Sequence, residues 1–155
     1  MKLLSNPFRK LDGYNCFGCS PDNSQGLQMQ FFDAGDSVIS TWEPTNNFEG
    51  WHNVLHGGIQ ATLMVEIASW VVFAKLGTTG VTSKMEVKLT KPMHMDKGPV
   101  KLVARLLEMR RNIAVIAVEL FDCEESCCAE GIFHYFTYPE KVAKEKLFYP
   151  GHEKF

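Results

Sequence analysis

The sequence predicts an α+β domain in which an antiparallel sheet packs against one long helix. Its longest apolar run extends from Ile59 to Leu76, between a His-Gly-Gly sequence at 56–58 and Gly77. Glycines before and after an apolar run are typical of helix ends. Segments of alternating apolar and polar residues lie on both sides of this run, and their short connections favour antiparallel pairing.

The expected elements follow in the order two strands, one helix, four strands. Turns are expected at residues 33–36 and 110–112, where glycine, asparagine and charged residues gather. We expect a single domain over residues 1–155, with its core at about 14–138 and a partly helical or loose extension at 139–155. The strands are expected at residues 27–32, 37–43, 81–91, 100–109, 113–121 and 128–138.

The helix is apolar on nearly every side, and its few polar residues include Thr62, Glu66 and Ser69 on one stripe. Its length is close to that of a membrane span, but a mid-run carboxylate and the strands around it favour a buried core helix without membrane contact. Because one sheet cannot surround such a helix, we expect a second copy of the chain to cover the remaining face, about a two-fold axis.

Composition excludes several classes of protein. A formal net charge of −2 gives no reason to expect a nucleic-acid partner. The apolar stretch near residue 1 is too short to predict a signal peptide, and the five cysteines are odd in number, so we expect a cytoplasmic protein with reduced thiols. The Cys16-x-x-Cys19 spacing is compatible with half a zinc site, a redox pair or an ordinary loop. The other cysteines lack zinc-site spacing, so we expect ordinary thiols and no metal.

Two parts of the helix are candidates for chemistry. The backbone N–H groups at Gly57 and Gly58 are suited to an oxyanion or a phosphate, although paired glycines also permit close packing of a helix on a sheet. Burial raises the pKa of a carboxylate such as Glu66 and suits it to general-base catalysis, although a buried glutamate is more often structural. His56 and Glu66 are roughly 15 Å apart along the axis, so both act on one small group only if a partner chain or a kink joins them.

Basic and hydroxyl side chains near strand ends form a weaker pattern. Cations at these positions are suited to phosphates, although most are simply solvated, and the hydroxyls are compatible with plain surface residues. The basic residues are Lys88, Lys91, Arg110 and Arg111, and the hydroxyls after the helix are Thr82 and Ser83.

These motifs resemble the hotdog-fold acyl-CoA thioesterases of the phenylacetate-degradation (PaaI) type. The resemblance rests on the His-Gly-Gly helix start, the strand order, and the sequence Asn-Cys-Phe-Gly-Cys at 15–19 with Gly26-Leu27. The Phe-Glu-Gly loop at 48–50 resembles the thioesterase superfamily member 4 subgroup. The resemblance covers residues 14–138. It implies a homodimer or a dimer of dimers with interface sites, coenzyme A as part of the substrate, no further cofactor, and no metal or redox role for the cysteine motif.

The same resemblance implies that the Gly57 N–H polarises the thioester carbonyl and that a carboxylate on the partner's helix acts as base or nucleophile. Counted from His56, that carboxylate position is Val65, and Glu66 is one step further, about 100° around the helix. The first hypothesis is thioester hydrolysis with Glu66 as the base. In it, His56 and Gly58 shape the site, Thr82 or Ser83 supplies a strand hydroxyl, and Lys88, Arg110 and Arg111 hold the coenzyme A phosphates.

A second hypothesis is a weak or inactive acyl-CoA-binding protein, because Val65 cannot activate water. A hydratase or dehydratase is less favoured, since no His and Asp have a suitable spacing.

Overall fold

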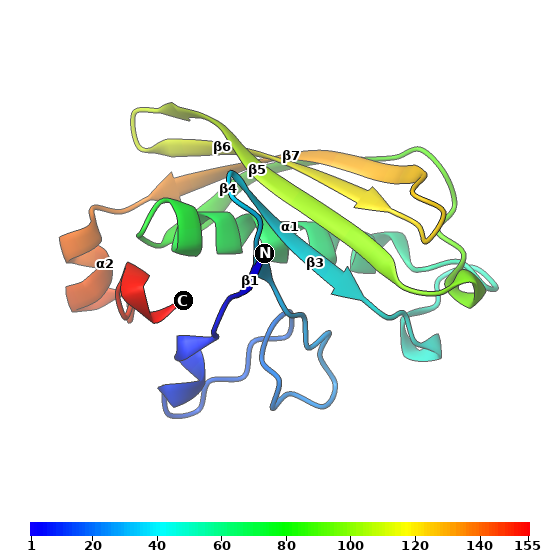
Figure 1. Cartoon of the computed structure of the whole chain (residues 1–155), viewed down its shortest axis with the longest axis horizontal. Coiled ribbons are helices and arrows are strands. Elements are labelled where there is room, and N and C mark those ends of the chain that lie inside the picture. The colour runs from blue at the N-terminus through cyan, green and yellow to red at the C-terminus, as the bar shows by residue number, and fades with distance from the viewer.

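The computed structural model describes residues 1–155 and contains one seven-stranded antiparallel sheet with one long helix. Figure 1 shows the sheet arching over the helix α1, with the N-terminal segment on the opposite side of that helix. The strand order is β1-β2-β3-β5-β6-β7-β4. The elements are β1 (Lys2–Leu3), η1 (Pro7–Lys10), β2 (Phe32–Asp33), β3 (Ser37–Trp42), η2 (Asn46–Phe48), α1 (Gly57–Lys75), β4 (Gly80–Leu89), η3 (Met95–Lys97), β5 (Val100–Arg110), β6 (Ile113–Phe121), β7 (Cys127–Thr137), α2 (Glu140–Lys146) and η4 (His152–Lys154).

The predicted turns are confirmed, and each contains a residue with left-handed backbone geometry. Gly35, between β2 and β3, has φ 83°, and Arg111, between β5 and β6, has φ 57°. Strand β3 buries Val38, Ser40 and Trp42 in alternation, so its period-two pattern also matches its environment. The α+β class and the single antiparallel sheet around one long helix are therefore as expected.

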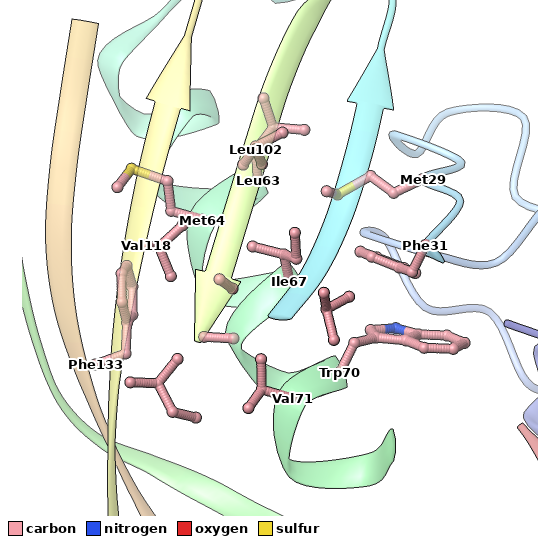
Figure 2. Close-up of a cluster of buried hydrophobic side chains, with 14 of the residues drawn as sticks. Met29, Phe31, Leu63, Met64, Ile67, Trp70, Val71, Leu102, Val118 and Phe133 are labelled. Atoms are coloured by element: carbon pink, nitrogen blue, oxygen red, sulfur yellow. The ribbon is translucent and has the colours of Figure 1, made fainter. Parts of the chain in front are cut away.

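The core lies between α1 and the central strands. Figure 2 shows Leu63, Ile67 and Val71 of α1 facing the sheet beside Leu102 and Val118. On another side of the helix, Trp70 stacks on Phe31 with ring centroids 4.4 Å apart. Fully burying side chains of this size contributes roughly 1.5–3 kcal/mol each, so these contacts fix the helix against the sheet.

The predicted strand at residues 27–32 is wrong for most of its length. Only Phe32 and Asp33 pair in the sheet, although Leu27 and Met29 are buried in alternation as the pattern indicates. The N–H groups of Leu27 and Met29 donate to the carbonyls of residues 17 and 18, so a loop, not a strand, satisfies this backbone. The structure also adds β1 to a region expected to be irregular, and β4 begins at Gly80, where the strand was expected.

The C-terminal extension is not loose. After α2, the Tyr149 hydroxyl donates to the Phe73 carbonyl oxygen at 2.9 Å, and Phe155 packs edge-on against Trp70 with centroids 5.6 Å apart. From the N-terminal segment, Phe8 packs on Phe73 at 5.1 Å. The expectation that a second chain covers the rest of α1 is therefore corrected in part, because both termini of the same chain cover one flank of it.

One face of α1 stays only partly buried, and it carries Gly58, Thr62, Val65, Glu66 and Ser69. By length and composition alone, the helix could cross a membrane, but half of its most apolar 18-residue segment is buried inside the fold. This burial against a sheet is what the sequence predicted for a core helix.

Candidate active site

The N-terminus of α1 presents a free backbone donor at Gly57. His56 is the N-cap, and its Nδ1 accepts a hydrogen bond from the Gly58 N–H at 2.9 Å. The N–H of Gly57, the first helical residue, has no hydrogen-bond partner in the chain. The cap therefore uses the Gly58 donor and leaves the Gly57 donor free, aligned with the positive end of the helix dipole.

A cavity of about 370 Å³ lies at this helix end, and its lining includes Trp51, Gly57, Gln60, Leu89 and Lys91. A Cβ atom on Gly57 would lie 2.9 Å from Leu89 Cδ1, so the absence of a side chain lets β4 approach the helix closely. Lys91 places a cation at the cavity, which favours an anionic group there.

Glu66, in the middle of α1, lines a second cavity of about 200 Å³ together with Cys16, Ser69 and Phe73. The Cys16 thiol donates to Glu66 Oε1 at 3.5 Å. Gly18 packs so closely that a Cβ atom there would lie 2.5 Å from Glu66 Cδ. Burial, reinforced by negative charge on Cys16, raises the pKa of Glu66 to about 7. The carboxyl group therefore titrates near neutral pH.

The two cysteines beside Glu66 are in different environments. Cys16 is half-buried and Cys19 is buried. The Cys19 thiol lies within 4.8 Å of the Cys16 sulfur, and this contact lowers the pKa of Cys16 and raises that of Cys19. Behind Cys19, the Tyr14 hydroxyl lies 3.0 Å from the Cys19 sulfur. The sequence analysis treated these cysteines as ordinary thiols. Their contact with Glu66 depends on a loop packing on a helix fifty residues later.

A chain of hydroxyl groups connects α1 to β7 and β4. The Tyr135 hydroxyl donates to the Val65 carbonyl oxygen at 2.7 Å and lies 2.9 Å from Ser69 Oγ. Burial raises the pKa of Tyr135 to about 12, so the phenol stays neutral. Thr82 is the cross-strand partner of Tyr135 and faces the phenol, whereas Ser83 Oγ donates to a backbone carbonyl. The alternation in β7 that turns Tyr135 inward was the available sequence signal for this residue, which the site prediction omitted.

The candidate phosphate-binding cations do not converge within one chain. Lys88 is near the end of β4 and pairs in register with Glu130, whereas Arg110 and Arg111 lie where β5 turns into β6, at the end of the sheet where β4 starts and with β7 between them and β4. Seven strand positions separate Lys88 from Val81 at that start, which is roughly 23 Å. Arg110 is also paired with Glu108 at 2.6 Å. Lys91, not Lys88, is the basic residue that lines the cavity at Gly57.

The two central site residues lie apart as well. Gly57 and Glu66 are nine residues apart on one helix, about 14 Å along its axis, and they line different cavities. The largest cavity, about 610 Å³, lies beside residues 24–30 and β3 and contains neither of them. Within one chain, the structure brings together Glu66, Ser69, Tyr135 and Thr82, but not Gly57.

Comparison with known proteins gives the class to which this chain belongs. The family model described as thioesterase superfamily matches residues 52–129, half of the chain, which contain α1 and strands β4 to β6. The chain belongs to the thioesterase superfamily, and its fold is the hotdog fold of that superfamily. No curated protein sequence matches the chain.

Solved structures with this fold include several thioesterase superfamily proteins. A thioesterase from Haemophilus influenzae has a TM-score of 0.67 and 22% identity, over 74% of this chain and 80% of that one. A hypothetical thioesterase from Streptococcus pneumoniae with coenzyme A has a TM-score of 0.65 and 22% identity, over 70% of this chain and 87% of that one. A Streptococcus mutans protein bound to acetyl-CoA has a TM-score of 0.67 and 19% identity, over 83% of this chain and 96% of that one. Against another thioesterase superfamily protein, with TM-score 0.68 and 20% identity, the match covers 75% of this chain and 57% of that one.

Proposed function

We propose that the protein is an acyl-CoA thioesterase that hydrolyses a thioester to a free acid and coenzyme A. The observation that carries the proposal is the carboxyl group of Glu66, which titrates near neutral pH on the partly buried face of the superfamily's central helix. A base with a pKa close to the working pH is suited to activating water. The coenzyme A and acetyl-CoA in the similar structures support this class of substrate.

The oxyanion site in this proposal is the free Gly57 N–H. As the thioester carbonyl is attacked, negative charge develops on its oxygen, and a preorganised N–H at a helix N-terminus stabilises that charge. His56 holds the helix end through its cap on Gly58, so it positions the donor without touching the substrate. Lys91 is suited to an anionic part of the substrate at the same cavity.

The active site is assembled from two copies of the chain. Edge strand β4 exposes Met85 and Leu89 by 48% and 50%, on the face that they share with their buried cross-strand partners Phe133 and Ala129, and an isolated monomer would leave these apolar side chains in water. The partly buried face of α1 lies beside this edge. A two-fold pairing over these surfaces would bring Gly57 of one copy toward Glu66 of the other, which removes the separation of about 14 Å within one helix.

A spacing in two similar structures supports the pairing of Glu66 with Thr82. Separate variants of the Streptococcus pneumoniae thioesterase replace an aspartate and a threonine that are sixteen positions apart in that chain. Glu66 and Thr82 are also sixteen positions apart. In this proposal Glu66 is the base and Thr82, through Tyr135 and Ser69, orders the polar side of the site.

The experiment that tests the interface uses subunit complementation. The Gly57→Pro and Glu66→Gln variants are each expected to be nearly inactive on a panel of short, long and aromatic acyl-CoA esters. Co-expressed, they should form mixed dimers with one intact site of two, which restores about a quarter of the wild-type rate. Free coenzyme A is measured chromatographically, because the protein's own thiols react with thiol dyes. No recovery would place both groups in one chain.

The second candidate is an acyl-CoA-binding protein with little turnover. The packing of Gly18 on Glu66 favours it, because a carboxylate enclosed by its own loop is less available to substrate. This candidate predicts coenzyme A ester binding without hydrolysis, and turnover in Val65→Asp. Wild-type hydrolysis that is lost in Glu66→Gln and not raised in Val65→Asp would exclude it.

A further inference from the structure

Three reactive side chains meet where the loop at residues 14–20 packs on α1. The sulfur atoms of Cys16 and Cys19 and a carboxylate oxygen of Glu66 all lie within 4.8 Å of one another. The Ser20 N–H donates to the Cys16 carbonyl oxygen at 3.1 Å and closes the turn that holds the two thiols together. Both cysteines are free thiols in the structure.

The two thiols differ in access and in proton affinity. Both thiols line the cavity of about 200 Å³, but Cys16 is half-buried whereas Cys19 is buried. The Cys19 thiol and the N–H groups of Gly18 and Cys19 face the Cys16 sulfur and lower the pKa of Cys16. Cys16 therefore has the character of the attacking thiolate, and Cys19 that of a protonated thiol directly behind it.

A metal ion fits this cluster less well than a disulfide. A closed structural zinc site takes four protein ligands, and this cluster offers three. Tyr14 and Asn6 already contact the Cys19 sulfur, at 3.0 and 3.7 Å. Cys123 contacts Lys97 and Cys128 contacts Asp122, so the remaining cysteines lie at another site.

We propose that Cys16 and Cys19 form a thiol–disulfide pair that a hydroperoxide oxidises. The Cys16 thiolate attacks the hydroperoxide, so that an S–O bond forms, the O–O bond breaks, and the departing oxygen takes a proton and leaves as an alcohol or water. Cys19 then attacks the Cys16 sulfur, an S–S bond forms, the S–O bond breaks, and the oxygen leaves as water with the Cys19 proton. Two thiols lose two electrons, and the hydroperoxide is reduced.

Oxidation changes the surroundings of Glu66. The disulfide removes the negative charge on Cys16 and its hydrogen bond with Glu66 Oε1, both of which raise the pKa of Glu66. The other ionisable groups facing Glu66 are Cys19 and, from β7, Tyr135, and both are neutral because their pKa values are raised. The oxidised protein should therefore hydrolyse at lower pH than the reduced protein. This consequence rests on the proposed function, whereas disulfide formation does not.

The chemical test uses reduced protein and one equivalent of cumene hydroperoxide. Wild type should lose two hydrogen atoms by intact mass, with a Cys16–Cys19 crosslink in the peptide map, and dithiothreitol should reverse it. Cys19→Ser should stop at a sulfenic acid that a 1,3-dione labels at residue 16, and Cys16→Ser should not react. Cys123→Ser, which removes an exposed thiol elsewhere, should behave as wild type.

Kinetic and metal measurements complete the test. At pH 6.5, iodoacetamide should alkylate Cys16 at least about tenfold faster than Cys123. Equal alkylation rates at Cys16 and Cys123 would overturn the proposal, and so would disulfides that join Cys16 or Cys19 to other cysteines. It would also be overturned if the purified protein held one zinc ion per chain, if this zinc were absent from Cys16→Ser, and if it blocked oxidation. If the disulfide forms but no acyl-CoA is hydrolysed in either redox state, the thiol pair stands and the proposed function fails.

Discussion

The N-terminus and the middle of α1 are two reactive regions built in different ways. At the N-terminus, His56 caps the helix and frees the Gly57 N–H through contacts within three residues. In the middle, Glu66 is surrounded by Cys16 and Gly18, which are about fifty positions earlier in the chain. A local site depends on helix geometry alone, whereas the middle site exists only after the N-terminal loop has packed on the helix.

The largest expected effect is at the middle site. Glu66→Gln keeps the size of the side chain but cannot accept a proton, so kcat should fall roughly 10²- to 10⁴-fold. In the wild-type protein, kcat/KM should rise with pH through about 7, where Glu66 loses its proton. The measurement is a pH–rate profile of the reduced protein, with Glu43→Gln, a change at an exposed glutamate, as the control. A wild-type profile that is flat between pH 6 and 8 would contradict the assignment.

The next effect is at the helix N-terminus. Gly57→Pro removes the free N–H at the first helical position, where proline is tolerated, and His56 already has the extended backbone that precedes a proline. We expect kcat to fall about 10²- to 10³-fold with the helix content by circular dichroism unchanged.

Gly57→Ala is the matched control for that substitution, since it places a Cβ atom against Leu89 but keeps the N–H. Its kcat should stay much closer to wild type. An equal loss in both variants would assign the effect to packing against β4.

The packing of the N-terminal loop on Glu66 is tested by Gly18→Ala. The added Cβ atom would lie 2.5 Å from Glu66 Cδ, so we expect a loss of about 1–3 kcal/mol in the free energy of unfolding by urea titration. In a Glu66→Ala background the same change should cost much less, because the carboxyl group it meets is gone. Equal costs in both backgrounds would show that the loop does not press on Glu66.

The smallest effect is a pH dependence of stability. Native Glu66 keeps its proton up to about pH 7, whereas the unfolded chain releases it near its ordinary value of 4.5, so unfolding releases a proton between these values and stability falls as pH rises. The lowered pKa of Cys16 acts in the opposite direction, so the comparison is made in Cys16→Ser. In the Cys16→Ser background, the free energy of unfolding should fall with rising pH by at most about 1.4 kcal/mol per pH unit, and Glu66→Gln should remove this fall.

Much of the fold was predictable because it follows from local patterns. The helix over residues 57–75, the strands after it and the turns at Gly35 and Arg111 match the alternation and the turn chemistry of the sequence. The stretch at 27–31 has strand alternation but pairs with a loop. Its side chains are buried at every second position, as in a strand, but this alternation does not show which segment accepts the hydrogen bonds of its backbone.

The α+β class, the His-Gly-Gly helix start and the single acid in an apolar helix follow from the amino-acid sequence alone. Each of these depends on neighbours within a few residues. The tertiary structure adds the contact of Glu66 with two thiols and the position of Thr82 opposite Tyr135. Those contacts join residues far apart in the chain, and burial at their meeting point is what moves the pKa of Glu66 to about 7.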